Sequence, residues 1–169
     1  NYAAAVLCSP VYRERYAPRL QIEFPRVPLP RDAKVAISLA GLGNEVVTIH
    51  LFQSARSERF ITAYMGPRQP DVERVTYSNG KVWLDKRQTC GFAGVPEAVW
   101  NFHIGGYQVC EKWLKDRKGR TLSKDDIAHY QKIVVAISET IRLMKEIDEV
   151  IEKHGGWPAA FVTTPPKAK

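Results

Sequence analysis

The strongest constraint on the fold is a long amphipathic stripe in the last third of the sequence. Over 127–151, apolar residues recur at steps of three and four, the spacing of a helix with one buried face. Ser123 and Asp126 resemble a capping box before this stripe, and Gly155 supplies a stop after it. The pattern predicts a helix over 124–153, whose apolar face is either part of the core or a docking face for another domain.

A second helix is predicted over 33–53, because its apolar residues also follow the three-four spacing and Asp32 is placed to cap it. Gly41 and Gly43 lie inside this helix. Each weakens a helix by about 1 kcal/mol relative to Ala, so they mark close packing or a break.

An Asn-Gly pair at 79–80 is the strongest hairpin signal in the sequence. A two-residue turn fixes the register of the flanking residues over 72–85, so that Tyr77 faces Val82 on one side of the hairpin. That side is expected to be core, and the other to be polar with the indole of Trp83 exposed.

The remaining segments give weaker patterns. We expect a short helix interrupted at Pro10 over 2–16, extended chain over 24–30, an irregular loop or short strand over 86–94, and a helix over 107–115. The predicted fold is α+β, with a small antiparallel sheet that includes the hairpin at 72–85 and packs with long helices at 33–53 and 124–153. Residues 1–158 are expected to form a single domain, and residues 159–169 a disordered tail.

The chain is basic, with a formal net charge of +7 and a pI near 9.4. Such a balance favours acidic partners, either nucleic acid or anionic lipid. No segment approaches the roughly 18 apolar residues of a membrane span, and the first nine residues lack the layout of a signal peptide. We therefore expect a cytoplasmic protein with no membrane partner, and a fragment of a larger protein because the chain begins at Asn1.

Few patterns in the sequence point to catalysis. There is no Gly-Lys-Ser/Thr phosphate loop, and the four histidines and three cysteines lack the spacing of metal ligands. The sharpest catalytic alternative is a metal-dependent nuclease that uses Asp71 with Asp116 and Lys118. We expect no catalytic residue, no metal site and no cofactor in this chain.

Two groups of side chains suit the binding of DNA. A basic turn follows the helix over 107–115, and residues 111–124 carry six basic against two acidic side chains, a local net charge of +4. Phosphate contacts are expected from Lys112, Lys115, Arg117, Lys118, Arg120 and Lys124. Base reading is expected from Arg74, Lys81, Trp83, Lys86, Arg87 and Gln88 in the hairpin and its loop, and from Gln108. The alternative for the basic turn is an ordinary solvated loop. The alternative for Trp83 is packing against a helix.

The string from Trp100 to Asp148, with SPVYRERY and FPRVPLP upstream, resembles the C-terminal specificity domain of Type ISP restriction-modification enzymes. The segments IGGYQV, KWLKDRKGR and DIAHYQ carry the resemblance, which extends over about 2–158. Its signature positions are Gly105, Gly106, Tyr107, Gln108, Lys112, Trp113, Lys115 and Arg117 to Arg120. Among the apolar residues of this region, Ile104 and Trp113 are expected to be core.

The resemblance implies a DNA-binding target-recognition domain that is not an enzyme by itself. Its partners would be double-stranded DNA and the methyltransferase and motor domains of the same polypeptide. The parent would be an adenine methyltransferase that uses S-adenosylmethionine, either alone or together with a nuclease and a helicase-like motor that use ATP and Mg²⁺. Residues 74–94 depart most from the family pattern, so target choice is expected there.

The alternative is a helical coupling module of the same parent with no direct base readout. In that case the long apolar stripe would dock another domain, and the positive charge would be incidental. Exposed apolar area on the final helix, together with scattered basic residues, would favour this alternative.

Overall fold

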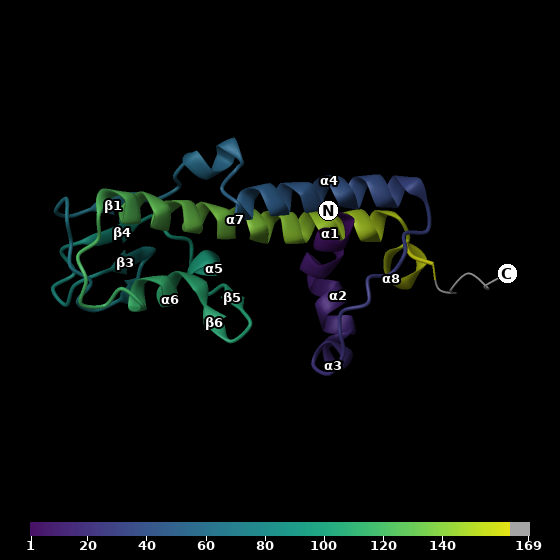
Figure 1. Ribbon diagram of the computed structural model, residues 1–169, viewed down its shortest axis with the longest axis horizontal. Helices are drawn as coiled ribbons and strands as arrows, with labels where there is room; N and C mark the ends of the chain where they lie inside the picture. The colour runs from purple at the N-terminus through teal and green to yellow at the C-terminus, as the bar shows by residue number, and fades with distance from the viewer. Residues whose placement is uncertain (163–169) are drawn as a thin grey trace. The chain divides into compact units, whose positions relative to one another are not determined.

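The computed structural model describes residues 1–162, and the contacts among them define two compact units (Figure 1). Unit 1 contains residues 1–51 and the chain from Glu139 onward, and unit 2 contains residues 52–138. The helix α7 (Lys124–Lys153) contributes its first half to unit 2 and its second half to unit 1. The single domain expected over 1–158 stays a prediction.

Unit 1 is helical. Pro10 interrupts the first predicted helix, as expected, because it occupies the first position of a new helix, where its missing N–H removes no helical hydrogen bond. Extended chain follows over 24–30, where the hydroxyls of Tyr2 and Tyr12 donate to the carbonyls of Pro28 and Arg26. The elements wholly within this unit are α1 (Tyr2–Cys8), α2 (Pro10–Arg15), α3 (Ala17–Leu20), α4 (Ala33–His50) and α8 (Gly156–Ala159).

Helix α4 begins as predicted, because a carboxylate oxygen of Asp32 accepts a hydrogen bond from the backbone N–H of Val35 at 3.0 Å. It ends at His50 rather than at residue 53, and Phe52 beyond it has a φ of +53°. The helix has no break at its glycines. It lies in unit 1, where it packs against α1, and not in the unit that contains the sheet.

Polar contacts fasten the second half of α7 within unit 1. The Ser9 hydroxyl donates to Asp148 at 2.5 Å, and the ring of His50 lies 2.7 Å from the hydroxyl of Thr140. Leu143, Ile147 and Ile151 are buried beside these contacts. The amphipathic stripe therefore covers core in this part of α7.

The chain after α8 returns to the core of unit 1. Ala160 and Phe161 are buried, and the Phe161 ring stacks on Trp157 with centroids 4.1 Å apart. The fold therefore extends past residue 159, where the sequence analysis begins the tail, because large apolar side chains precede the polar end of the chain. The tail's remaining residues, 163–169, lie outside the described residues.

Unit 2 contains a four-stranded antiparallel sheet in the order β1-β4-β3-β2. Its strands are β1 (Ala63–Met65), β2 (Thr76–Ser78), β3 (Lys81–Trp83) and β4 (Gly91–Ala93). The unit also holds the 3₁₀ helix η1 (Ala55–Glu58), α5 (Glu97–Trp100), the small hairpin of β5 (His103–Ile104) and β6 (Tyr107–Gln108), and α6 (Val109–Lys115). The α+β prediction is confirmed, although β1 gives no strand signal in the sequence.

The hairpin prediction is confirmed at its centre and fails at its ends. Tyr77 pairs with Val82 as expected, around a turn in which Asn79 and Gly80 both have positive φ. The register does not continue to residues 74 and 85, because the backbone N–H groups of Glu73 and Arg74 both donate to the carbonyl of Leu84. The ladder therefore consists of three residue pairs, with three residues from each strand.

The first half of α7 packs on the core face of this sheet. Its start is capped as predicted, since Ser123 and Asp126 exchange hydrogen bonds of 3.0 and 3.1 Å between side chain and backbone N–H. The ring of Tyr130 lies 4.5 Å from that of Phe92 on β4, and both are fully buried. Within residues 1–162, no helix is long and apolar enough to cross a membrane.

Two glycines of α4 provide a matched test of this packing. A Cβ on Gly43 would lie 2.0 Å from the Asn1 carbonyl oxygen, whereas one on Gly41 would meet nothing within 4 Å. We predict that Gly43→Ala lowers the free energy of unfolding by about 1–3 kcal/mol through overpacking. Gly41→Ala should raise it by about 0.5–1 kcal/mol, the gain in helix propensity. Urea denaturation measures both values, and equal effects at the two positions would contradict the α1–α4 packing.

Candidate nucleic-acid interface

The basic turn after α6 is fixed to an earlier segment by backbone pairing. Residues 70–72 run antiparallel to residues 119–122, and the hydroxyl of Thr121 also donates to the carboxylate of Asp71. The backbone N–H to carbonyl bonds join Gly119 to Val72 (2.8 Å), Val72 to Arg120 (2.9 Å), and Leu122 to Pro70 (2.8 Å). We call residues 66–72 and 117–124 together the basic strap.

The strap carries cationic side chains that the rest of the structure leaves free. These exposed side chains are Arg68, Lys118, Arg120 and Lys124. Within residues 1–162, none of the four has an acidic or hydrogen-bonding side-chain partner. Arg68 and Lys124 also line one hollow of about 510 Å³ beside Tyr64. Their charges are therefore available to an external anion.

Two other predicted phosphate ligands are already paired along α6. Lys112 Nζ lies 2.8 Å from Asp116, and Lys115 Nζ lies 2.9 Å from Glu111. The hydrogen bond to Asp116 is the main cause of the raised pKa of Lys112. Exposed pairs of this kind contribute only about 0–1 kcal/mol, so a phosphate can displace them, but they offer less free charge than the strap.

Arg117 has a structural position. Its guanidinium carbon lies 3.5 Å from the centroid of the Trp113 ring, and its Nη1 donates to the Trp113 carbonyl at 3.0 Å. Its Nε also lies 3.7 Å from Asp126. The indole packs in turn against Tyr130, at 5.6 Å between centroids. Arg117 therefore holds the turn to the core and is a weaker candidate for a phosphate contact.

The loop after β3 is organised by Asp85. Burial opposes ionisation of this carboxyl, but hydrogen bonds from Thr89 and from the backbone of Cys90 and Thr89 outweigh it and lower the pKa of Asp85 to about 2. Arg87 and Gln88 are exposed at the tip of this loop, and Gln88 adopts a φ of +56°. These two predicted base readers are therefore held on a defined turn.

Several other predicted base readers already contact their own unit. The indole N–H of Trp83 donates to the Ser78 hydroxyl at 3.0 Å, so this ring is half-buried rather than exposed. Lys81 Nζ lies 5.5 Å from the centroid of the same ring. Lys86 Nζ lies 3.0 Å from Glu73. Arg74 is exposed and, within residues 1–162, has no side-chain partner.

The predicted environments of Gln108 and Ile104 are the reverse of those in the structure. The side-chain amide of Gln108 is half-buried and donates to the carbonyl of Trp100 at 2.5 Å, which makes it part of the scaffold. Ile104, expected to be core, is 56% exposed. The apolar character of Ile104 does not predict its exposure, because in the described part of the chain the two-residue strand β5 pairs with β6 alone.

Arg68 is the strap residue that the sequence analysis misses. It stands alone among Gly66, Pro67, Gln69 and Pro70, far along the chain from the basic turn. Only the backbone pairing of residues 70–72 with 119–122 brings it close to Lys124. No local charge pattern could have identified it.

The described residues offer little for catalysis. Within residues 1–162, no three His, Cys, Asp or Glu side chains converge as a metal-binding group. Asp116 of the nuclease alternative is paired with Lys112, and Asp71 accepts a hydrogen bond from Thr121. Burial raises the pKa of Cys110 to about 12, so this thiol stays protonated near neutral pH.

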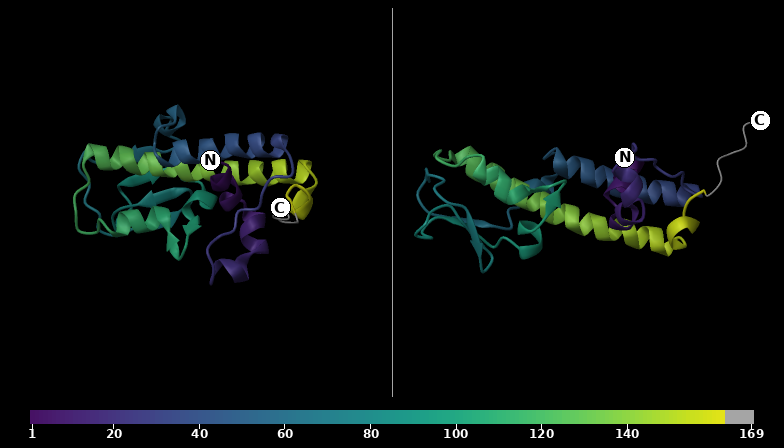
Figure 2. Two further views of the ribbon diagram at one scale, coloured as in Figure 1. Left: turned by 45° about the vertical axis from the view of Figure 1, so that its right-hand side comes forward. Right: turned by 90° about the horizontal axis from the view of Figure 1, so that it is seen from below.

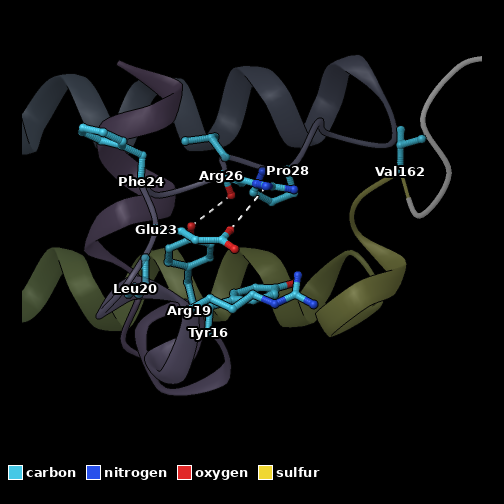
Figure 3. Close-up of a pocket in the computed structure, with 10 residues that line it drawn as sticks. Tyr16, Arg19, Leu20, Glu23, Phe24, Arg26, Pro28 and Val162 are labelled. Carbon is cyan, nitrogen blue, oxygen red and sulfur yellow. Dashed lines mark hydrogen bonds and ion pairs between the residues drawn. The ribbon is translucent and has the colours of Figure 1, made fainter. Parts of the chain in front are cut away.

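Unit 1 has a hollow of its own, of about 370 Å³ (Figure 3). Tyr16 and Phe24 line it, and an ion pair of 3.3 Å joins Glu23 to Arg26 at its edge. Phe24 is 95% exposed, and the nearby Ile22 is 83% exposed. This surface combines apolar side chains with the charged groups of Arg19, Glu23 and Arg26, and it differs in kind from the basic strap of unit 2.

The free cations of the strap offer positive charge that suits an extended anion. The model of the Type ISP C-terminal specificity domain family matches residues 1–146. The chain therefore belongs to this family of specificity domains from restriction-modification enzymes, as its sequence resemblance predicts. No curated protein sequence matches the chain significantly.

Solved structures with the same fold include three larger proteins. A nuclease-deletion mutant of the Type ISP enzyme LlaGI, in complex with a DNA substrate mimic, has a TM-score of 0.62 and 18% identity over 86% of this chain and 15% of its own. The ATP-dependent Type ISP enzyme LlaBIII bound to DNA has a TM-score of 0.60 and 15% identity over 88% and 11%. The DrdV–DNA complex has a TM-score of 0.59 and 23% identity over 86% and 17%. This chain spans less than a fifth of each of these three proteins.

Arg117 and Lys118 are neighbours in the basic turn, and substitutions of the two should have different effects on stability. We predict that Arg117→Ala lowers the free energy of unfolding by about 1–2 kcal/mol, because it removes the stacking on Trp113 and a charged hydrogen bond. Lys118→Ala should change it by less than about 0.5 kcal/mol, since that side chain has no partner. Chemical denaturation measures both, and a loss at Lys118 as large as that at Arg117 would contradict these positions.

The low pKa of Asp85 predicts a pH dependence. A carboxyl whose pKa is lower in the folded state stabilises the fold above its unfolded pKa, here about 3.8, and loses that contribution as pH falls towards 2. Asp85→Asn should therefore be less stable than the unmodified chain at pH 7, and the difference should shrink between pH 4 and pH 2. Urea denaturation at several pH values measures it, and a difference independent of pH would show that the carboxylate does not organise the loop.

Proposed function

We propose that this chain is a DNA target-recognition domain of a restriction-modification enzyme and that unit 2 binds the duplex. The observation that carries the proposal is the basic strap, whose free cations project from segments fixed by backbone hydrogen bonds. Duplex DNA presents about one negative charge per 1.7 Å of axis, so such cations bind it with release of counterions. The DNA complexes of the three similar structures support this assignment.

Base recognition requires side chains that a rigid support carries into a groove. In our proposal Arg87 and Gln88 have this role, since both are exposed on the turn that Asp85 organises. Arg74 is exposed as well, and its backbone N–H donates to the carbonyl of Leu84, the residue before Asp85. Arginine can pair with guanine and glutamine with adenine through two hydrogen bonds each. The other predicted base readers then act mainly by shaping the surface, because their polar groups already have partners. They are Trp83, Lys81, Lys86 and Gln108.

Catalysis in the parent protein would belong to other domains. We propose that an adenine methyltransferase with S-adenosylmethionine lies in the same polypeptide, together with a motor and nuclease that use ATP and Mg²⁺. This domain would hold the duplex while the methyltransferase extrudes the target adenine. A cytoplasmic location, where the DNA substrate lies, follows from this role.

The coupling alternative expected exposed apolar area on the final helix. The structure buries that stripe instead, with Tyr130, Val134, Ile147 and Ile151 fully buried. The two most exposed large apolar side chains of residues 1–162, Phe24 and Ile22, lie elsewhere in unit 1. That exposure favours a contact with other domains for the segment around Phe24, and it does not compete with the strap.

Salt-dependent binding tests the proposal. Fluorescence anisotropy with random duplex DNA at several salt concentrations should give a Kd of about 10⁻⁴ to 10⁻⁶ M near physiological salt, weakening as salt rises. Each of Arg68→Ala, Lys118→Ala, Arg120→Ala and Lys124→Ala should reduce the slope of log K against log salt by about 0.9. Lys112→Ala and Lys115→Ala should have smaller effects, because those cations are already paired.

Matched controls come from exposed lysines of the same charge in unit 1. Lys145→Ala and Lys153→Ala remove one positive charge each from α7 outside the strap, and they should leave the slope unchanged. Equal slope changes for strap and control variants would mean that net charge alone drives binding. No binding at low salt would reject DNA recognition by this chain and favour the coupling alternative.

A further inference from the structure

The hairpin of β5 and β6 presents two large apolar side chains to solvent. Ile104 is 56% exposed and Tyr107 is 62% exposed, and they pair directly across the two-residue turn. Side chains of directly paired residues lie on the same face of a two-stranded ribbon. Figures 1 and 2 show that this hairpin projects from unit 2, with its turn directed away from α7. Its tip is therefore an exposed apolar surface that neither the core nor the strap uses.

The turn at this tip is made of two glycines with different requirements. Gly105 has a φ of +59°, which suits the first position of a type II′ turn and explains a glycine there. Gly106 has no positive φ, and a Cβ at this position would meet nothing within 4 Å. The turn itself therefore requires only the first glycine.

The base of the hairpin is held firmly. The Gln108 amide donates to the Trp100 carbonyl at 2.5 Å, and the backbone N–H of Val109 donates to the carbonyl of Phe102 at 3.3 Å. Trp100 is buried and stacks on Tyr77 with ring centroids 5.1 Å apart. The tip is thus a narrow apolar projection on a rigid support.

The charges around the tip indicate which partner it fits. The hollow beside it, of about 330 Å³, is lined by Lys112 and Lys115, whose ion pairs with Asp116 and Glu111 leave it neutral overall. The basic turn begins at the opposite end of α6, about 10 Å away for seven residues at 1.5 Å each. A neutral apolar tip this close to free cations suits the stacked bases of a nucleic acid, whose phosphates the strap can hold.

We propose that the β5–β6 hairpin is a wedge, and that Ile104 and Tyr107 enter the duplex at a base step. The proposal rests on the proposed function, because the strap must first hold the DNA. Apolar side chains inserted between base pairs unstack them and kink the helix. The cost of unstacking is lowest where stacking is already broken, so a wedge prefers DNA that contains such a site. Tyr107, with Lys112 Nζ 5.4 Å from its ring centroid, would stack on the exposed base.

Duplexes of about 20 base pairs, one intact and one with a central abasic site, test the wedge without knowledge of the target sequence. The unmodified chain should bind the abasic duplex about tenfold more tightly than the intact one. The double variant Ile104→Ser with Tyr107→Ala should reduce this preference to less than about twofold, while Tyr107→Phe should keep it, because stacking needs only the ring. The control Phe60→Ala with Ile61→Ser removes exposed apolar side chains elsewhere in unit 2 and should keep it as well.

The outcomes separate the wedge from the proposed function. Salt-dependent binding of both duplexes with equal affinity by the unmodified chain would overturn the wedge and leave DNA recognition standing. No binding of either duplex at low salt would overturn both. A second readout is the fluorescence of 2-aminopurine placed after a thymine in an intact duplex, a flexible step that unstacks easily. It should rise on binding of the unmodified chain and not on binding of the double variant, and equal responses would also overturn the wedge.

Discussion

The pairing of residues 70–72 with residues 119–122 is the constraint on which the binding surface depends. It brings Arg68 next to Lys124 although 55 residues separate them in the sequence, and it fixes the backbone that carries Lys118 and Arg120. A basic loop without this pairing would have to be ordered on binding, at a cost in conformational entropy for each residue. The strap is ordered before any ligand arrives.

Basic side chains of the strap and of α6 differ in their contacts although they carry the same charge. Arg117 stacks on Trp113 and secures the turn, whereas its neighbour Lys118 is free. In α6, Lys112 and Lys115 each have a carboxylate one helical turn away. A local net charge of +4 therefore overstates what the surface offers to a phosphate, and the position of Arg68 partly compensates. The apolar tip at Ile104 and Tyr107 adds a chemistry that charge alone does not provide.

The sequence predicts the elements whose signals are local. The helix over 124–153, the cap at Asp32 and the turn at 79–80 are all confirmed, because spacing, capping and turn residues act within a few positions. Strand β1 was missed, since a three-residue strand gains its identity from its partner β4. The two groups of site residues were recognisable by type, but their partners depend on contacts distant in sequence. For that reason the predictions of an exposed Gln108 and a buried Ile104 were wrong, and Arg68 was not predicted as a site residue.

Hydrogen–deuterium exchange of the chain, measured by mass spectrometry with and without duplex DNA at low salt, tests the central claim most directly. Binding through the strap and the hairpin predicts slower exchange in residues 66–72, 103–108 and 117–124, with residues 20–29 of unit 1 unchanged. Slower exchange confined to residues 20–29, or protection absent from both parts of the strap, would contradict a DNA-binding surface on unit 2.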